Sequence, residues 1–514
     1  MLGNSESFLN SLPGDLNIDA SLDTLEKAGS DVFFTGDHSP FVVLYPDSVN
    51  QVESIWASAS DYDVPIVNRG AGLSYTAGVL PNSSNTALLD LSKLTKISPP
   101  NLTDRVITVE AGVRWQMIDE LLANGCYRLA MPTPISGSRS TVGGAIAQGL
   151  PVGLESVIGL EVVIPGGELL KIGACHWGEK QRGCHRMMGA DLIGLFMGSG
   201  GILGTIVSAH LRLESQPKIV SHRSYSTRNL AHSAEVITRL SATEADPLLI
   251  ALPVRRERDI AKIGVRDKIK LAWNALRSCN THLARLKLLF QLSQLSFTPH
   301  DDEDMACVHV TVEATSKNES SRVMAELDAL AVLHDAIPVS SAVPAIFYSR
   351  PYSLRGMLGP KGERWVPVHG ISAISGLSEL ALCASEFIDK QGENAAAMGI
   401  SITWMIMSWP GKCALIEPMF LWSAPLLPVH SLAGDIAKRV VIEPSKEASQ
   451  RTDRVIQLRE MLIQQLDECG ALHLQLGKSY AYRERLSRTA DQILSAIKKE
   501  VDPKLLCSPG NLGF

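Results

Sequence analysis

The chain has 514 residues, of which 45% are hydrophobic and 20% are charged, and its formal net charge is -6. This length predicts more than one domain, and the acidic balance gives no support for nucleic acid as the main partner. The nine cysteines are an odd number without regular spacing, which argues against a disulfide framework. Without a signal peptide or an apolar stretch of about 18 residues, we expect a cytoplasmic protein.

The first predicted elements are a strand, a helix and a second strand. Residues 41–45 (FVVLY) are rich in β-forming side chains and end at Pro46. Apolar residues from Val49 to Ala59 recur at helical spacing, and residues 65–67 begin the next strand. Further strands are expected at 87–91, 106–109, 160–164 and 202–213. The chain therefore opens with a domain that mixes helix and sheet.

A glycine-rich loop follows the second of these strands, within residues 65–78 (PIVNRGAGLSYTAG). Gly70 and Gly72 allow positive φ angles and a close approach to a ligand, and successive N–H groups in such a turn bind anions. Ser74 adds a hydroxyl donor and Arg69 a charge. The loop matches neither the Rossmann fingerprint nor a P-loop. Taken alone, it is equally compatible with an ordinary tight turn.

Two more loops of this kind occur in the same predicted domain. Residues 132–144 (PTPISGSRSTVGG) combine small hydroxyls with paired glycines, and residues 191–204 (DLIGLFMGSGGILG) lead into a strand. Three such loops separated by strands are improbable as surface decoration. They predict one elongated ligand that lies across several loop ends.

The composition changes after about residue 215. A basic helical stretch lies at 266–297; a helix with a solvated face is favoured there over binding to a membrane surface or a partner. Strands are expected at 308–312 and 400–407, and an amphipathic helix at 451–468. We therefore expect three parts, which are residues 1–215, an inserted α+β unit at 216–470, and a return of 471–514 to the first domain.

The order of these motifs resembles the flavin domain of the vanillyl-alcohol oxidase / p-cresol methylhydroxylase superfamily. The matching segments are PIVNRGAGLSYTAG, STVGGAIAQG, SVIGLEVVIPGGELLKIG, DLIGLFMGSGGILGTIV and the terminal DPKLLCSPGNLGF. The resemblance covers roughly residues 41–213 and 471–514. It implies an α+β protein with a two-subdomain FAD-binding domain of the p-cresol methylhydroxylase type. It also implies a substrate cap that contains an antiparallel sheet.

The resemblance also implies which residues bind FAD. The pyrophosphate would be bound by Asn68, Arg69, Gly70, Ala71, Gly72, Leu73 and Ser74. Ser138, Thr141 and Gly144 would lie near the flavin and its ribityl chain, and Ile206 would contact the adenine end through its backbone. Pro132 and Gly201 complete the predicted cofactor-binding set.

The chain departs from relatives that carry covalently linked flavin. Where members with a histidyl link place histidine in the pyrophosphate loop, this chain has Leu73, and no cysteine lies near Gly137. Attachment at those two positions is excluded. A link from a cap residue, such as His369 or a tyrosine, stays open, and we expect FAD to be bound non-covalently.

Two substrate classes are compatible with the predicted cap. In the alkylphenol-oxidising branch of the superfamily a Tyr-Arg pair binds the substrate phenolate, and Tyr482 and Arg483 match that pair by type and place. A cation and a phenolic O–H favour the phenolate of a bound phenol. The structural alternative is that these two residues only begin a helix.

Other segments resemble flavin dehydrogenases of D-2-hydroxy acids, namely CALIEPMFLW at 413–422 and LHLQLGKSY at 472–480. For such a substrate Arg483 would bind the carboxylate, and His473 or His369 would take the hydroxyl proton. A structural role is the more common alternative for any single histidine. Glu417 is either a buried acid or structurally paired.

We therefore predict an FAD-dependent oxidase or dehydrogenase that acts on an alcohol or a D-2-hydroxy acid, with a para-alkylphenol as the alternative substrate. Two other classes are weighed against it, a non-catalytic flavin-binding or nucleotide-binding member and a nicotinamide-dependent dehydrogenase, which lacks its fingerprint. The electron acceptor, whether oxygen, a quinone or a cytochrome, is unassigned, and a homo-oligomer, such as a dimer, is expected. No metal is predicted, since the pairs Cys175-His176 and Cys184-His185 lack zinc-ligand spacing.

Overall fold

The computed structural model places most of the chain in two compact units. It describes residues 2–130, 135–150, 154–175, 185–186, 189–255, 305–341, 343–348, 362–409, 413–427 and 446–514. The first unit contains the described residues within 1–216, Leu427 and residues 474–514. The second unit contains the described residues within 217–426 and residues 446–473. Both termini of the chain therefore belong to the first unit.

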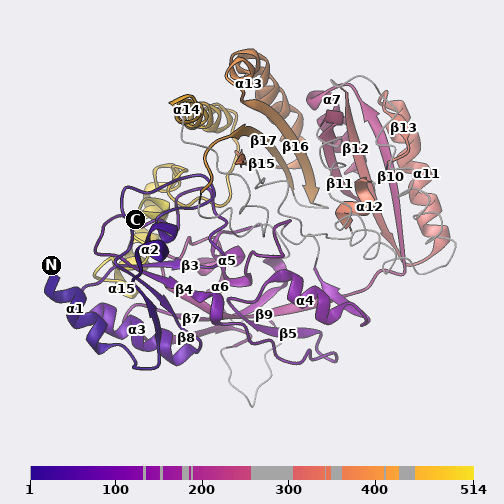
Figure 1. Cartoon of the computed structure of the whole chain (residues 1–514). Helices are drawn as coiled ribbons and strands as arrows, with labels where there is room; N and C mark the ends of the chain where they lie inside the picture. The colour runs from indigo at the N-terminus through magenta and orange to yellow at the C-terminus, as the bar shows by residue number, and fades with distance from the viewer. Residues whose placement is uncertain are drawn as a thin grey trace. The chain divides into compact units, whose positions relative to one another are not determined.

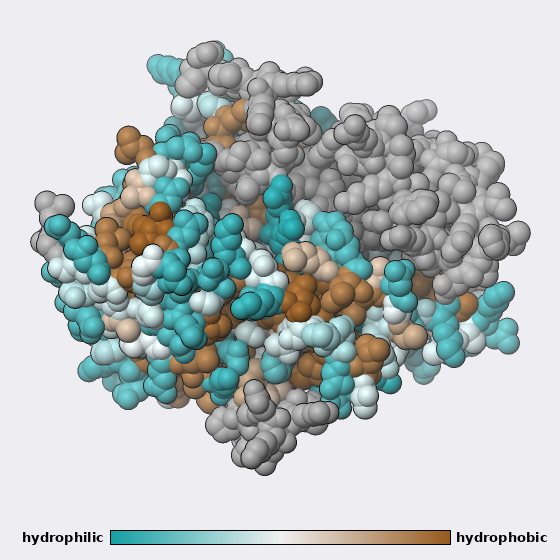
Figure 2. Space-filling view, turned by 60° about the horizontal axis from the view of Figure 1, so that its bottom comes forward, coloured by the Kyte–Doolittle hydropathy of each residue, from teal (hydrophilic) through white to brown (hydrophobic). Residues whose placement is uncertain are grey.

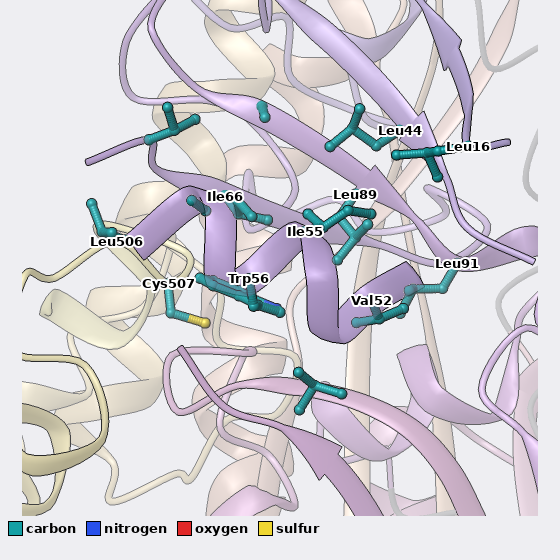
Figure 3. Close-up of a cluster of buried hydrophobic side chains, with 14 of the residues drawn as sticks. Leu16, Leu44, Val52, Ile55, Trp56, Ile66, Leu89, Leu91, Leu506 and Cys507 are labelled. Carbon is teal, nitrogen blue, oxygen red and sulfur yellow. The ribbon is translucent and has the colours of Figure 1, made fainter. Parts of the chain in front are cut away.

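The first unit begins with a 4-stranded sheet of order β1-β2-β4-β3, in which β2, β4 and β3 run parallel. Its strands are β1 (Asn17–Asp19), β2 (Val42–Tyr45), β3 (Ile66–Arg69) and β4 (Ala87–Asp90). The helices beside it are α1 (Leu2–Ser11), α2 (Leu22–Ala28) and α3 (Val49–Asp61). Val52, Ile55 and Trp56 of α3 are fully buried against Leu44 and Leu89 of the sheet (Figure 3). This packing explains the helical spacing of the apolar residues in the sequence.

The second sheet of the first unit is antiparallel and has 5 strands. The main order is β5-β9-β7-β8, and β6 also pairs with β9. Its strands are β5 (Val106–Glu110), β6 (Tyr127–Leu129), β7 (Val157–Val163), β8 (Leu169–Gly173) and β9 (Thr205–Ser215). The accompanying helices are α4 (Trp115–Leu122), α5 (Val142–Ala147) and α6 (Ile193–Phe196).

The C-terminal residues pack into the same unit. They form α15 (Arg488–Val501) and two 3-10 turns, Arg483–Arg485 and Asn511–Gly513. Ile66 of β3 donates its N–H to the Leu506 carbonyl and accepts a bond from Ser508 N, both at 2.8 Å. Leu506 and Cys507 thereby join the cluster around Trp56 (Figure 3).

The second unit is built on an 8-stranded antiparallel sheet of order β13-β10-β12-β11-β16-β17-β14, in which β15 also pairs with β17. Its first strands are β10 (Ile219–Thr227), β11 (Leu248–Pro253), β12 (Ala306–Ala314) and β13 (Ile337–Val339). The others are β14 (Glu363–Pro367), β15 (Gly370–Ser372), β16 (Ser401–Trp409) and β17 (Cys413–Ser423). The antiparallel sheet expected in this part of the chain is therefore confirmed.

Four helices cover one face of this sheet (Figure 1). They are α7 (Leu230–Leu240), α11 (Lys317–Leu333), α13 (Leu377–Ala397) and α14 (Lys446–Glu468). The short helix α12 (Val343–Tyr348) packs on the opposite face, where Val343 joins an apolar cluster. That cluster contains Ile250, Leu252, Met405, Met407, Trp409, Leu415 and Met419, with Trp365 and Ile371 against it. We call this side of the sheet the apolar face.

Most of the expected elements form where the residues predict them, and the α+β fold with an antiparallel sheet is confirmed. The strand expected at 202–213 begins only at Thr205, because Gly200, Gly201 and Gly204 have positive φ angles that end the preceding turn. The predicted helical stretch 266–297 lies outside the described residues. Within the described part of the chain, Cys383 and Cys469, which are 86 positions apart, form a disulfide.

Of the described helices, none is long and apolar enough to cross a bilayer. On the face drawn in Figure 2, hydrophobic residues form several groups separated by hydrophilic ones. Single exposed apolar residues, such as Leu22 and Leu121, are ordinary on a protein surface.

Candidate functional site

The first glycine loop has a row of backbone donors for which the described residues offer no acceptor. It follows β3, and the N–H groups of residues 70 to 74 donate to no acceptor among the described residues. Buried or half-buried N–H groups are nearly always bonded in folded proteins. Five consecutive donors therefore indicate an anionic ligand that accepts bonds from them.

The conformation of this loop depends on glycine at two positions. Gly72 has φ +67°, and a Cβ there would lie 2.4 Å from a guanidinium nitrogen of Arg69. Arg69 also donates to the carbonyls of Lys27 and Ala28, where α2 ends. Burial lowers the pKa of the Arg69 guanidinium, an effect that nearby Asp90 and Asp31 oppose. Arg69 therefore packs against the turn at Gly72 and links it to the end of α2.

The second loop meets the first at Gly70. Thr141 caps α5, and its Oγ1 accepts a hydrogen bond from Gly144 N at 3.3 Å. A Cβ on Gly70 would lie 2.4 Å from the same Oγ1. The two loops can touch only because residue 70 has no side chain.

The third loop reaches the same region through α5 and the C-terminal residues. Gly200 N donates to the carbonyl of Ala147 at the end of α5, at 2.8 Å. The buried Asn511 Nδ2 donates to the carbonyls of Gly78 at 2.9 Å and Gly200 at 2.7 Å. All three loops therefore converge within the first unit.

Asn68 and Gly201, two of the predicted cofactor-binding residues, are neighbours. A Cβ on Gly201 would lie 3.2 Å from Asn68 Nδ2. Asn68 Oδ1 accepts a bond from Thr205 Oγ1 at 2.6 Å, and Thr205 in turn accepts from Trp56 Nε1 at 2.8 Å. The Asn68 side chain thus connects β3 to β9, where Ile206 is buried.

The other predicted cofactor residues have varied surroundings. Ser74 is buried, and its hydroxyl shares a hydrogen bond with Thr76 Oγ1 at 3.1 Å. The Ser138 carbonyl accepts a bond from Arg114 at 3.3 Å. Ala71 and Leu73 belong to the row of donors already described. Pro132 lies outside the described residues.

The donor set suits a diphosphate. Loop residues 68–78 include no acidic side chain. The nearby carboxylate of Asp31 already accepts bonds from the N–H groups of Phe33, Phe34 and Ala77. Free backbone donors, a left-handed glycine and no carboxylate side chain within the loop are what a bound pyrophosphate requires.

In the second unit, His369 and Glu417 form a buried pair. The register that pairs Pro367 with Met419 and Gly370 with Ile416 puts His369 opposite Glu417 on β17. His369 Nε2 lies 3.1 Å from Glu417 Oε1, and the side chains are 3% and 7% exposed. Because side chains alternate along a strand, Glu417 shares the apolar face with Leu415 and Met419, residues of that cluster. A buried pair of titratable side chains on an apolar face is a functional-site candidate.

The structure brings the two predicted histidines together. His473 Nδ1 contacts the carbonyl oxygen of His369, and its Nε2 contacts Asp467 Oδ1 at 2.6 Å. Each histidine therefore has its own carboxylate partner. Sequence reasoning missed Asp467, because an aspartate near the end of an amphipathic helix carries no local signal.

Tyr482 and Arg483 belong to the first unit, whereas these histidines belong to the second. Arg483 donates to Asp491 at 2.6 Å, Ser495 at 3.1 Å and the Gly513 carbonyl at 3.2 Å. Its guanidinium carbon also lies 4.3 Å from the ring centre of Phe514. Tyr482 immediately precedes the 3-10 turn that Arg483 begins. This environment favours the structural alternative for the pair.

No group of three or more His, Cys, Asp or Glu side chains that could hold a metal occurs among the described residues. Cys175 is buried, and burial raises the pKa of its thiol to about 12. Its neighbours His176 and Cys184 lie outside the described residues.

Comparisons with known proteins agree with this geometry. Residues 40–173 match the family model described as FAD binding domain. The chain is 28% identical to glycolate oxidase subunit GlcD of Bacillus subtilis over 246 residues, which are 45% of this chain and 50% of that protein. It is also 28% identical to a mitochondrial D-lactate dehydrogenase [cytochrome] of Arabidopsis thaliana over 215 residues, 40% of this chain and 36% of that protein. The matches thus span half or less of these relatives.

The fold likeness extends over the whole chain. A crystal structure of p-cresol methylhydroxylase with substrate bound superposes with a TM-score of 0.73 at 14% identity, covering 100% of this chain and 96% of that one. The matched family model includes the first two glycine loops and indicates FAD as the cofactor. The chain therefore contains an FAD binding domain and has the fold of the vanillyl-alcohol oxidase / p-cresol methylhydroxylase flavoproteins.

Proposed function

We propose that this protein is an FAD-dependent oxidoreductase that oxidises an alcohol or a D-2-hydroxy acid. The observation that carries the proposal is the row of unpaired N–H groups from Gly70 to Ser74, within the segment that matches an FAD binding domain. Similarity to glycolate oxidase and D-lactate dehydrogenase supports the hydroxy-acid class.

The residues of the first unit would hold the cofactor. Gly70 to Ser74 would donate to the pyrophosphate, and Thr141 and Gly144 would line the flavin end. Bound FAD supplies an acceptor for the electrons of the substrate C–H bond. A nicotinamide-dependent reaction has no support, because the loop after β3 does not lead into a helix.

The residues of the second unit would bind the substrate. His369 is the candidate proton acceptor for the hydroxyl group, and Glu417, 3.1 Å from its Nε2, would orient the ring and stabilise the imidazolium that forms. The apolar face around this pair would exclude water from the reacting atoms. In this proposal residues 216–470 are the substrate cap.

A para-alkylphenol is the second candidate substrate. The fold of p-cresol methylhydroxylase motivates it. Arg483, predicted to bind either the phenolate or the carboxylate of a hydroxy acid, already donates to Asp491, Ser495 and Gly513. These contacts weigh against a binding role for Arg483 toward either substrate class.

The test is the visible spectrum of the purified protein, followed by anaerobic bleaching with a panel of D-2-hydroxy acids, primary alcohols and para-alkylphenols. We expect a flavin spectrum that bleaches with a hydroxy acid or an alcohol. A colourless protein that FAD cannot reconstitute would contradict the cofactor assignment. Bleaching by alkylphenols alone would replace the substrate class, and flavin that no compound bleaches would favour a non-catalytic role.

Three further properties are part of the proposal. We expect a homo-oligomer such as a dimer, testable by light scattering, and an acceptor among oxygen, quinones and cytochromes, testable by reoxidation rates. A cytoplasmic location is expected, although the Cys383–Cys469 disulfide weighs against it, because reducing compartments rarely keep structural disulfides. Cell fractionation tests whether the protein is in the cytoplasm.

A further inference from the structure

The chain segment that ends α14 is fastened to the rest of the second unit. Cys469 forms a disulfide with Cys383 of α13. Leu472 exchanges two backbone hydrogen bonds with Ile371 of β15, at 2.8 and 2.9 Å. The backbone position of His473, the next residue, is therefore fixed by these links, independently of the contacts of its side chain.

Both ring nitrogens of His473 face hydrogen-bond acceptors. Nδ1 lies 2.5 Å from the carbonyl oxygen of His369, and Nε2 lies 2.6 Å from Oδ1 of Asp467. A carbonyl and a carboxylate only accept, whereas a neutral imidazole has a single N–H. Both contacts are satisfied together only when the ring carries two protons. The His473 side chain is 2% exposed, so its charge depends on the neighbouring carboxylate.

We propose that Asp467 is a positioning residue that keeps His473 as a buried imidazolium, whose Nδ1–H holds the His369 carbonyl. In this arrangement His473 has no lone pair with which to accept a proton. The proton acceptor of the cap is then His369, and Asp467 and His473 fix the backbone from which its side chain reaches Glu417. This assignment of His369 rests on the proposed function, but the protonation of His473 does not.

The contact between His473 Nδ1 and the His369 carbonyl lies where it affects the position of the His369 side chain. His369 lies between β14 and β15, and Val368 N donates to the Pro418 carbonyl on one side of it. On the other side, Leu472 continues the sheet beyond Ile371. The His473 contact adds a bond to the carbonyl of His369 itself. Since a small rotation of this peptide would move the His369 ring away from Glu417, the bond sets the distance within that pair.

The test is NMR of the oxidised, substrate-free holoenzyme with 15N-labelled histidine, at pH 6.5, 7.5 and 8.5. His473→Gln identifies the signals of His473. We expect both ring nitrogens of His473 to be protonated at all three values in the wild type. We expect Asp467→Asn to give the neutral ring at pH 7.5 and above, and Asp467→Glu to restore the cation. A non-protonated ring nitrogen in the wild type at pH 7.5 would overturn the proposal.

The matched control is Glu468→Gln, which removes the adjacent exposed carboxylate of α14 and should leave the His473 signals unchanged. A second measurement concerns His369. With a substrate that bleaches the flavin, Glu417→Gln should slow flavin reduction by about 100-fold or more while FAD content is kept. Asp467→Asn should slow flavin reduction less than Glu417→Gln does, and it should shift the pH profile of the reduction rate. Unchanged reduction in Glu417→Gln would overturn the role of His369 while the NMR result stands.

Discussion

At the scale of single residues, the cofactor loop depends on two positions where any side chain would collide. The space beside Gly70 is taken by Thr141, and that beside Gly72 by the Arg69 guanidinium. Thr141 belongs to the second glycine loop, so the close approach at Gly70 joins two loops. Arg69 belongs to the same loop as Gly72, so the close approach there shapes that loop alone. Glycine is thus required here for contact as well as for backbone conformation.

We predict that Gly72→Asp abolishes FAD retention. The new side chain would meet Arg69, strain a residue at φ +67° and place a negative charge beside the pyrophosphate. The ratio of flavin to protein absorbance after purification measures the effect. The control is Gly166→Asp, which has φ +96° but an exposed position with nothing within 4 Å. Equal loss of FAD in both variants would mean that backbone strain alone, and not the loop's contacts, explains the result.

Motifs in the sequence predict the glycine loops much better than they predict the His369–Glu417 and His473–Asp467 pairs. Gly70 and Gly72 are recognisable because one short segment contains every residue of the turn. Glu417 is recognisable only as a buried or paired acid without a known partner, and Asp467 is not recognisable at all, because the partner of each is a histidine outside its own element. His369 opposes Glu417 only through the register of two strands, which no local pattern contains.

At the scale of elements, α15 holds the C-terminal residues through one buried ion pair. Lys498 Nζ donates to Asp502, to the Ile202 carbonyl at 2.7 Å and to the Cys507 carbonyl at 3.1 Å. Asp502 also accepts the N–H groups of Leu506 and Cys507. The pair therefore connects α15, the third glycine loop and the strand-like segment beside β3.

We predict that Lys498→Met lowers the free energy of unfolding by roughly 3–5 kcal/mol, because it leaves the Asp502 carboxylate buried without its cation. The double variant Lys498→Met/Asp502→Asn should lose less than Lys498→Met alone. Denaturant unfolding measures both. Lys499→Met, which changes the exposed neighbour on the same helix, is the control and should stay within about 0.5 kcal/mol of wild type. Equal losses in the Lys498 and Lys499 variants would contradict a buried pair.

Elements were predicted well where periodicity is strong. α3 and β9 carry apolar residues at the spacing their packing demands, and both form close to the expected bounds. The pairing of β14 and β15 with β17 and the Cys383–Cys469 cross-link were not foreseen. Each joins segments tens of residues apart, so tertiary packing and not local propensity decides them.

At the scale of the whole molecule, the chain leaves its first unit near residue 216, touches it again at Leu427 and returns to it for the last time at residue 474. The returning segment completes the region where the glycine loops converge. Asn511, three residues before the last residue Phe514, is buried and joins the carbonyls of Gly78 and Gly200 through its amide nitrogen. The region thus combines residues from the first and the last parts of the chain.

We therefore predict that Asn511→Asp separates the loops. The substitution replaces the amide nitrogen by a carboxylate oxygen and leaves the shape of the side chain nearly unchanged. The carboxylate cannot donate, so two hydrogen bonds are lost and a buried negative charge faces two carbonyl oxygens. The expected cost is roughly 3 kcal/mol or more, with reduced FAD retention. Thermal unfolding and flavin absorbance measure these effects. Asn50→Asp makes the same change at an exposed position in the first turn of α3, where an acidic residue is favourable, and should keep both stability and flavin. If Asn511→Asp kept its full flavin content, the C-terminal residues would support the fold without shaping the cofactor site.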